Sequence, residues 1–245
     1  MSDPEELARL VRSFAEACRE HGLDLAQPLQ IGWYNQAVDP AYRAPDFDRP
    51  SSLAVVVGNS RALWPALARA LADDEALAAD PNPVDAYCRR ALQTAAVALG
   101  AHAWTARFSY DPPPRRVAMQ RLAHVSGLAY LAPSQLSVHP RYGPWIALRA
   151  LVVVDREGPP GPAPTLAPPC DCSGGCEPLL REALERSRVP QPSSDDIAVD
   201  WRTWLAVRDA CPVGRAFRYD DDQIRYHYTK DRRFLPLADT EARRR

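Results

Sequence analysis

The run Ile146–Val154 constrains the fold of this 245-residue chain most strongly, because it is apolar along its length except for Arg149. Such a run is typical of a strand that is buried on both faces, so layers of structure must cover it from two sides. A cation inside such a strand is costly unless an anion offsets its charge. Arg149 is therefore expected either to pair within the protein or to bind an anionic ligand.

The segment before this strand carries two histidines in different settings. His124 lies among the small and apolar residues of 123–129, a composition that lets the backbone approach a large flat ligand. A histidine in an apolar helix is, however, more often a neutral core residue than a ligand. His139 begins the Pro- and Gly-rich turn His139–Trp145, and we expect its side chain to be exposed.

Sequence patterns elsewhere predict intermingled helices and strands. Connections of both hairpin and crossover length favour an α+β layered domain with flanking helices over a doubly wound parallel sheet. Cys18 and Cys88 fall on apolar helical stripes, so both are expected in the core. The segment Gly58–Ser60 is read as an ordinary turn, since no phosphate-binding fingerprint accompanies it. The predicted helices are Asp3–His21, capped by Asp3, then Arg61–Ala79 and Asn82–Leu99, and the further strands are Leu29–Tyr34, Leu53–Val57 and His102–Tyr110.

The composition of the chain changes after Val154. Residues 157–169 contain six prolines and two glycines, which excludes a helix or a central strand and predicts an extended connector. Helical patterns return beyond it. We therefore divide the chain into a main α+β domain (1–156), a Pro-rich connector with a cysteine cluster (157–176) and a small C-terminal helical cap (177–245) that completes a pocket with the main sheet.

Charge and hydropathy exclude several classes of partner. The chain has 30 basic and 31 acidic residues, so no electrostatic argument supports binding to nucleic acid or to an anionic membrane. No apolar run approaches the ~20 residues that a bilayer span needs. Asp3, Glu5 and Glu6 occupy the positions where a signal peptide needs basic and then apolar residues. We expect a cytoplasmic protein with reduced cysteines.

Three cysteines within seven residues form the second chemical feature: Cys170, Cys172 and Cys176, with Cys211 as a possible fourth. Several thiolates turned toward one centre would select zinc or an iron–sulfur cluster. The spacing is CxCxxxC, whereas bacterial-type clusters begin with CxxCxxC. The alternative is a reduced thiol loop, or thiols that exchange with a small-molecule disulfide.

Several segments of the chain resemble a known family in order and spacing. They are Gly32–Asn35, Leu122–Tyr130, Val138–Arg149 with its HPRYGPW turn, and Trp201–Trp204 with Arg208–Ala210. Together they are similar to the methylmalonic aciduria and homocystinuria type C family over about residues 29 to 230. The resemblance implies a flavin-reductase or nitroreductase-like α+β fold. It also implies a protein that binds base-off cobalamin and removes its upper axial ligand, by reductive decyanation or by thiol-dependent dealkylation.

The resemblance also implies roles for individual residues. Arg149 and Arg208 would hold the carboxylates of glutathione, and a guanidinium is well suited to planar carboxylate recognition. Two departures stand out: Tyr130–Ala132 replaces three consecutive tyrosines of vertebrate members, and Ser137 replaces their cysteine. The residues that would bind the cobalamin are Val117, Ala118, Met119, Gln120, His124, Leu131, Ala132, Pro133, Ser137 and Leu148.

Three functions remain open at this stage. The first is the cobalamin-processing enzyme, and the second is a cobalamin carrier without catalytic activity. The third is a cobalamin-linked iron–sulfur reductase, because the cysteine cluster is similar in kind to the related epoxyqueuosine reductases. A flavin reductase that uses FMN or FAD is less favoured. Expected partners are a small thiol, a reductase that supplies electrons or a B12-dependent enzyme that receives the cofactor, and the chain would be a monomer or a homodimer.

Overall fold

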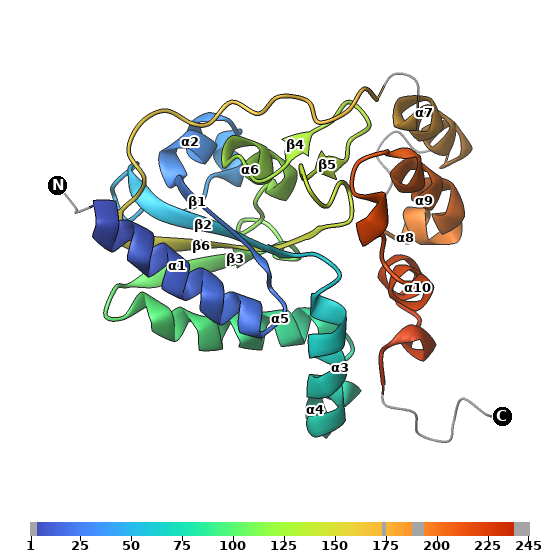
Figure 1. The fold of residues 1–245 in the computed structure, drawn as a ribbon, viewed down its shortest axis with the longest axis horizontal. Coiled ribbons are helices and arrows are strands. Elements are labelled where there is room, and N and C mark those ends of the chain that lie inside the picture. Colours follow the sequence, from blue (N-terminus) through green and yellow to red (C-terminus); the bar gives the residue numbers. More distant parts are fainter. Residues whose placement is uncertain (1–3, 173–174, 188–193, 238–245) are drawn as a thin grey trace.

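The computed structural model describes residues 4–172, 175–187 and 194–237. Its centre is a four-stranded sheet in the order β1-β2-β6-β3, in which every neighbouring pair is antiparallel (Figure 1). The predicted strand around Arg149 is confirmed as β6, one of the two central strands. The strands are β1 (Leu25–Gln30), β2 (Ser52–Asn59), β3 (Trp104–Phe108) and β6 (Ala147–Glu157).

Helices cover both faces of this sheet, which explains why β2 and β6 are nearly continuously apolar. On one face, Val55 and Val152 belong to a core with the helices α1, α3 and α5. On the other face, Val56 and Leu151 belong to a second core with the short helices α2 and α6. The helices are α1 (Pro4–Glu20), α2 (Ile31–Gln36), α3 (Leu63–Asp73), α4 (Glu75–Ala79), α5 (Pro83–Ala95) and α6 (Met119–Val125), with the 3-10 turns η1 (Pro40–Tyr42) and η2 (Ala96–Leu99).

A β-bulge in β6 determines where Arg149 points. Val57 lies opposite Ala150 and Gly58 lies opposite Leu148, so Arg149 has no residue opposite it on β2. A bulge re-aims the side chain of the unpaired residue, and Arg149 points to the same side of the sheet as Ala150, which belongs to the α1–α5 core. Leu148 packs with the α6 core, whereas Arg149 contacts Asp85 of α5 on the other face.

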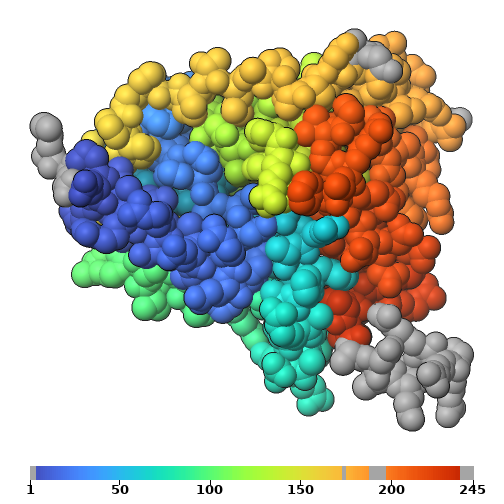
Figure 2. Space-filling view, in the orientation of Figure 1, coloured from blue at the N-terminus to red at the C-terminus, as the bar shows by residue number. Residues whose placement is uncertain are grey.

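The connector runs over the α2 and α6 side of the sheet (Figure 1). Residues 158–172 contain no helix or strand, as their prolines predict. Gln30 Nε2 donates to Pro159 O at 2.7 Å, and the connector's Pro164 packs so closely on Gly127 that a Cβ there would lie 2.9 Å from the Pro164 Cγ. Figure 2 shows the connector, in yellow, as a continuous ridge along the edge of the molecule.

A small second sheet and the C-terminal helices complete the structure. The two-stranded sheet of β4 (Tyr130–Leu131) and β5 (Ser137–Val138) follows α6. The C-terminal elements lie at one end of the main sheet (Figure 1), and the expected helical character is confirmed for the described part of residues 177–245. They are α7 (Cys176–Ser187), α8 (Ser194–Val199), α9 (Trp201–Ala210), η3 (Arg215–Phe217), α10 (Asp221–Thr229) and η4 (Arg232–Phe234).

The C-terminal helices share buried surface with the main domain. Tyr226 of α10 belongs to the α1–α5 core, where its ring lies 5.9 Å from that of Trp64. The turn before β6 also contacts the loop after α9: a Cβ added at Gly143, which has a φ of +58°, would lie 1.9 Å from Val213 O. Only glycine permits this approach of two backbones. The division at residue 177 remains a prediction.

The structure corrects some predicted boundaries. The strand predicted for Leu29–Tyr34 ends at Gln30, and Ile31–Gln36 is helical because Gly32 N donates to Pro50 O at 2.7 Å and draws the chain into a turn. The helix predicted for Arg61–Ala79 is divided at Asp74, whose carboxylate accepts a bond from Leu77 N and starts α4. The predicted cap Asp3 lies outside the described residues.

The α+β class is confirmed, and the predicted burial of Cys18 and Cys88 is confirmed as well. The turn expected at Gly58–Ser60 starts later than predicted, because Gly58 and Asn59 continue β2. Ser60 N and Oγ both donate to the Asp24 carboxylate. None of the described helices combines the length and the apolar character that are needed to cross a membrane.

Candidate functional site

Helix α6 and the two short strands after it form one surface, which we call the α6 surface (residues 117–137). Leu122 and Ala123 are fully buried beneath it, so this short helix is held by small and apolar contacts. Ala118 N donates to the hydroxyl of the buried Tyr34 at 2.8 Å, and this bond fixes the start of α6. The side chain of Gln120 is exposed and its Nε2 donates to Gln135 O at 2.6 Å.

His124 links α6 to β4. Its Nδ1 accepts a hydrogen bond from Leu131 N at 3.2 Å, and its ring lies 5.4 Å from that of Tyr130 in an edge-on arrangement. In the neutral imidazole the proton is then on Nε2, which is left as a donor. His124 is half-buried, so it is neither a sealed core residue nor fully exposed.

The structure gathers the predicted cobalamin-binding residues around this surface. Leu131 lies opposite Ser137 in the β4–β5 pair, and Ser137 Oγ is buried without a hydrogen-bond partner among the described residues. Ala132 is buried, whereas Pro133 is exposed. The remaining members share the α6 core: Val117, Ala118, Met119 and Leu148.

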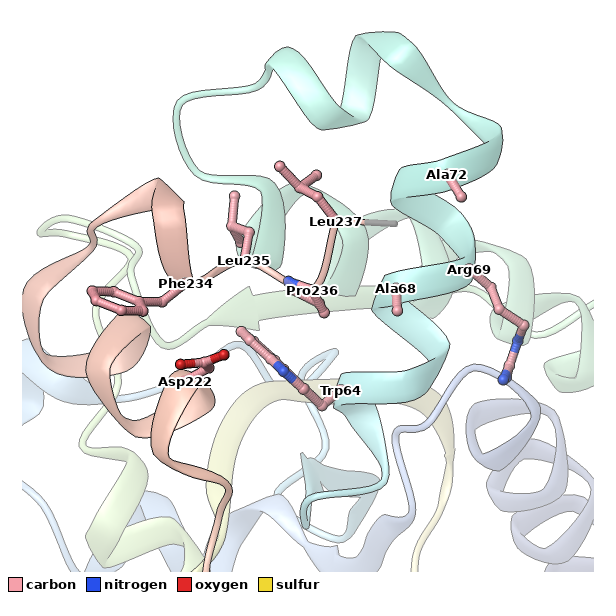
Figure 3. A pocket seen from close by; sticks show the side chains of 9 residues that line it. All are labelled: Trp64, Ala68, Arg69, Ala72, Asp222, Phe234, Leu235, Pro236 and Leu237. Carbon is pink, nitrogen blue, oxygen red and sulfur yellow. The ribbon is translucent and has the colours of Figure 1, made fainter. Parts of the chain in front are cut away.

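Three cavities stand out in the described structure, with volumes of about 480, 680 and 430 Å³. The first lies between α3 and the segment after α10, where Trp64 and Phe234 line it (Figure 3). The other two are lined by residues of α5 and of the segment 104–115. No predicted cobalamin-binding residue lines any of these three. The α6 surface is bordered by the connector, whose Pro164 packs on Gly127.

His139 corrects an expectation, because it is half-buried and holds the turn before β6. Its Nδ1 accepts from Arg141 N at 3.0 Å and from Tyr142 N at 3.2 Å. Burial lowers the pKa of His139, with Arg141 as a further cause and Asp24 acting in the opposite direction. The neutral ring therefore serves as a structural acceptor.

Arg149 is half-buried near the start of β6 and only partly neutralised. Its Nε donates to Asn59 Oδ1 at 2.7 Å, while its Nη1 lies 3.8 Å from the Asp85 carboxylate, near the limit of an ion pair. Its Nη2 is buried and has no hydrogen-bond partner in the part of the chain that the structure describes. Contacts within the protein thus occupy Nε and Nη1 of this guanidinium, and Nη2 is left without a hydrogen-bond acceptor among the described residues.

Arg208 approaches the same region from α9. Its Nη2 donates to Pro144 O at 2.5 Å, and its guanidinium carbon lies 4.7 Å from the ring centre of Trp145 and 5.5 Å from that of Tyr219. A guanidinium over an aromatic face is stabilised by the negative charge of that face. The residues before β6 therefore fix the position of Arg208.

The two arginines flank buried polar side chains of the C-terminal segment, and we call Arg149, Arg208, Tyr219, Gln223 and His227 the arginine cluster. The Tyr219 hydroxyl, both polar atoms of the Gln223 amide and His227 Nε2 are buried without partners among the residues described. Burial lowers the pKa of His227 well below its usual value, and Arg149, Lys230 and Arg208 lower it further. The cluster is therefore cationic and has unused donors, which suits an anionic ligand.

The sequence analysis missed three members of this cluster. Tyr219, Gln223 and His227 lie in a polar segment that was read only as part of the helical cap. One signal was present, because Gln223 and His227 are four residues apart and share a face of α10. Their burial against the main domain depends on tertiary contacts that the local sequence does not encode.

The four predicted cysteines of the second feature meet in space, and we call Cys170, Cys172, Cys176 and Cys211 the thiol cluster. The Cys170 and Cys172 sulfurs lie 3.6 Å apart, and Ser134 Oγ donates to Cys172 Sγ at 3.9 Å. Cys172, Cys176 and Cys211 are buried in an apolar cluster that includes Ala132. The thiol cluster thus lies directly beside the α6 surface.

The electrostatics of the thiol cluster favour protonated sulfurs. Burial, followed by the neighbouring thiols, raises the pKa of Cys170 to about 12, and burial also raises the pKa of Cys176. Within residues 4–172, 175–187 and 194–237, no group of three or more His, Cys, Asp or Glu side chains is arranged so that it could hold a metal ion. The expected zinc or iron–sulfur site at these cysteines therefore has no support in the structure.

Comparison with known proteins identifies the family. A sequence profile of the methylmalonic aciduria and homocystinuria type C family matches residues 22–235. The chain belongs to this family. A zebrafish (Danio rerio) relative named cyanocobalamin reductase / alkylcobalamin dealkylase is 27% identical, and the match covers 92% of this chain and 90% of the relative. The human relative of the same name is 28% identical, with 86% and 74% covered.

Solved structures agree with the fold. The B12-trafficking protein CblC of C. elegans matches with a TM-score of 0.67 and 19% identity, covering 96% of this chain and 97% of that one. An epoxyqueuosine reductase, solved in complex with a tRNA stem loop, matches with a TM-score of 0.53 and 12% identity, covering 94% and 71%. At these identities the likeness concerns the fold alone, and the resemblance noted in the sequence is confirmed at the level of the family.

Proposed function

We propose that this protein binds cobalamin and removes its upper axial ligand. The observation that carries the proposal is the family match over residues 22–235, together with relatives named cyanocobalamin reductase / alkylcobalamin dealkylase at 27% and 28% identity. The activity would be reductive removal of cyanide, removal of an alkyl group by a thiol, or both.

In this proposal the corrin ring lies against the α6 surface. The small side chains around His124 support this assignment, as does the meeting of the predicted residues across α6, β4 and β5. Because Pro164 of the connector packs on Gly127, we expect the connector to shift when so large a ring binds. Displacement of the lower base would make the bound cobalt easier to reduce.

The arginine cluster would hold the thiol co-substrate. Glutathione carries two carboxylates, and Arg149 and Arg208 supply two guanidinium groups beside Tyr219 and beside a His227 Nε2 that has no partner among the described residues. In dealkylation the thiol loses its proton and the thiolate attacks the alkyl carbon. A carbon–sulfur bond forms, the cobalt–carbon bond breaks, and its electron pair stays on cobalt. Fixed placement of the thiol gives the rate advantage of proximity.

Removal of cyanide differs from dealkylation because it needs an electron from an external donor. One electron from a reduced flavin or a partner reductase converts the trivalent cobalt to the divalent state, and cyanide leaves with its bonding pair. The proposal includes FMN or FAD as a source of these electrons. It also includes a flavin-reductase or nitroreductase-like arrangement of the layers and a cytoplasmic location. A small thiol is the co-substrate that the arginine cluster favours.

The direct test is to incubate the purified protein with methylcobalamin and increasing glutathione and to follow the corrin absorbance. We expect loss of the methyl ligand at a rate that saturates with glutathione, with methyl-glutathione as product. A protein that shifts the spectrum of cobalamin yet never removes the ligand, even with a reductant present, would be the carrier instead.

A cobalamin-linked iron–sulfur reductase is the second candidate. The observation that favours it is the fold likeness to epoxyqueuosine reductase, although the described cysteines are not arranged to hold a metal ion. Anaerobically purified protein would then be brown and contain iron, and both properties would be lost in Cys172→Ser and Cys176→Ser variants. Colourless, iron-free protein from the same preparation would exclude this candidate.

A further inference from the structure

Cys170 and Cys172 differ from the other cysteines in two ways. Of the six cysteines, five are buried and only Cys170 is partly exposed, so it alone can be reached by a small molecule. Its sulfur lies 3.6 Å from that of Cys172, close enough for a hydrogen bond between the two thiols. Cys172 is 5% exposed and lies behind it, next to Ser134.

The closing movement falls on Cys170, because Cys172 O accepts from Gly175 N at 3.3 Å and from Glu177 N at 3.1 Å at the start of α7. Both residues belong to the stretch 158–172, which contains no helix or strand, whereas Cys176 begins α7 and Cys211 directly follows α9. A disulfide requires a sulfur–sulfur distance of about 2.05 Å, so the pair must close by about 1.5 Å. An irregular segment can make this movement without breaking helix or sheet hydrogen bonds.

We propose that Cys170 and Cys172 form a reversible dithiol–disulfide pair that reacts with low-molecular-weight disulfides. Cys170 is the entry thiol and Cys172 is the resolving thiol. The pair would function in the absence of cobalamin, so the inference stands apart from the proposed function.

The exchange balances in two steps. Cys170 releases its proton to solvent and its thiolate attacks one sulfur of the small disulfide, whose S–S bond breaks to release one small thiol after protonation. The Cys172 thiolate then attacks the Cys170 sulfur of the mixed disulfide and releases the second small thiol. The protein loses two electrons and two protons, and the small disulfide gains both. Because neighbouring thiols and burial raise the pKa of Cys170 to about 12, the forward rate should increase with pH across the neutral range.

The test uses the full chain, reduced, desalted and equilibrated with defined mixtures of glutathione and its disulfide. Acid quenching, alkylation and mass spectrometry then report which thiols remain. We expect loss of two alkylatable thiols together, mapped to Cys170 and Cys172, with no retained glutathione and full recovery after reduction. The Cys172→Ser variant should instead accumulate glutathione on Cys170, because nothing resolves the mixed disulfide.

Two controls separate this exchange from general oxidation. Cys170→Ser should keep all its remaining thiols, since the entry point is gone, and Cys88→Ala should behave as the unmodified chain, because Cys88 is buried in the main core. The inference is overturned if the unmodified chain keeps all six thiols in excess disulfide or retains glutathione on Cys170. It is also overturned if the disulfide involves Cys176 or Cys211, or if one equivalent of zinc or iron protects the thiols.

Discussion

The arginine cluster and the thiol cluster both lie where the C-terminal helices meet the main domain, yet they are built from opposite chemistry. The arginine cluster combines two guanidinium groups with hydroxyl, amide and imidazole atoms that lack partners among the described residues. The thiol cluster contains neutral sulfurs that contact one another and apolar side chains. Burial of unpartnered polar atoms is costly, whereas burial of thiols is not. The first region therefore suits an anionic ligand, and the second suits covalent sulfur chemistry.

The largest difference between the clusters should appear in their packing. Trp145 is 1% exposed and supports Arg208 and Tyr219, so Trp145→Ala should lower the free energy of unfolding by about 3–5 kcal/mol. A smaller truncation beside the thiol cluster, Val207→Ala, should cost about 2 kcal/mol. Urea unfolding of both variants measures the difference, and equal losses would contradict the central place given to Trp145.

The next effect concerns the thiol co-substrate. Arg149→Ala should lower kcat/KM for glutathione in dealkylation by about 100-fold, or roughly 2.7 kcal/mol, because a charged hydrogen-bonding anchor is lost. Cobalamin affinity should change little, since Arg149 is not one of the residues of the α6 surface. Arg149→Lys should recover part of the loss.

Arg186 offers a control for this substitution, because it lies on the exposed face of α7 and pairs only locally with Glu182 among the contacts described. Arg186→Ala should leave both parameters unchanged. If Arg149→Ala abolished cobalamin binding in a folded protein, Arg149 would belong to the cobalamin site and its assignment to the thiol would be wrong.

A smaller, pH-dependent effect should come from His227. Its pKa is lowered in the folded protein, so the unfolded chain binds more protons once the pH falls below about 6.5. Stability contributed by the neutral ring is complete above that pH and decreases on acidification, by up to about 1.4 kcal/mol per pH unit. His227→Phe, which keeps a ring beside Trp64 and Tyr219, should flatten the dependence between pH 7.5 and 5.5 in urea unfolding. An unchanged slope would mean that His227 stays solvated.

The smallest effect is expected for Ser134, which contacts the thiol cluster through Cys172. Ser134→Ala removes one weak O–H to sulfur contact of 3.9 Å, so the free energy of unfolding should change by less than about 1 kcal/mol. A loss as large as that of Trp145→Ala would show that the thiol cluster depends on polar contacts, and the contrast between the two regions would fail.

Local sequence patterns were sufficient to predict the central strands but not the contacts of the site residues. β6 was predictable because burial on both faces requires a continuous apolar run, and Arg149 stood out against that run. The bulge that turns Arg149 toward Asp85 was not predictable, since it depends on the register with β2. Three of the clustered cysteines are close in sequence, so their meeting could be expected, and Cys211 joins them through the packing of α9 on α7.

The failed predictions have similar tertiary causes. Ile31–Tyr34 reads as a strand but is helical because of the Gly32 contact with Pro50. His139 was expected to be exposed, whereas its ring closes the turn before β6. Gln223 and His227 look like solvated residues of a helical cap until α10 packs on the main domain.

One spectroscopic titration tests the central claim most directly. Purified protein is added to cyanocobalamin and the visible absorbance is recorded, with a variant of the α6 surface, Ala129→Trp, as the matched comparison because Ala129 is fully buried beneath that surface. A saturable shift of the corrin bands to the base-off form, weakened in the folded variant, is the predicted result. An unchanged spectrum at protein concentrations well above those of the cobalamin would contradict the account.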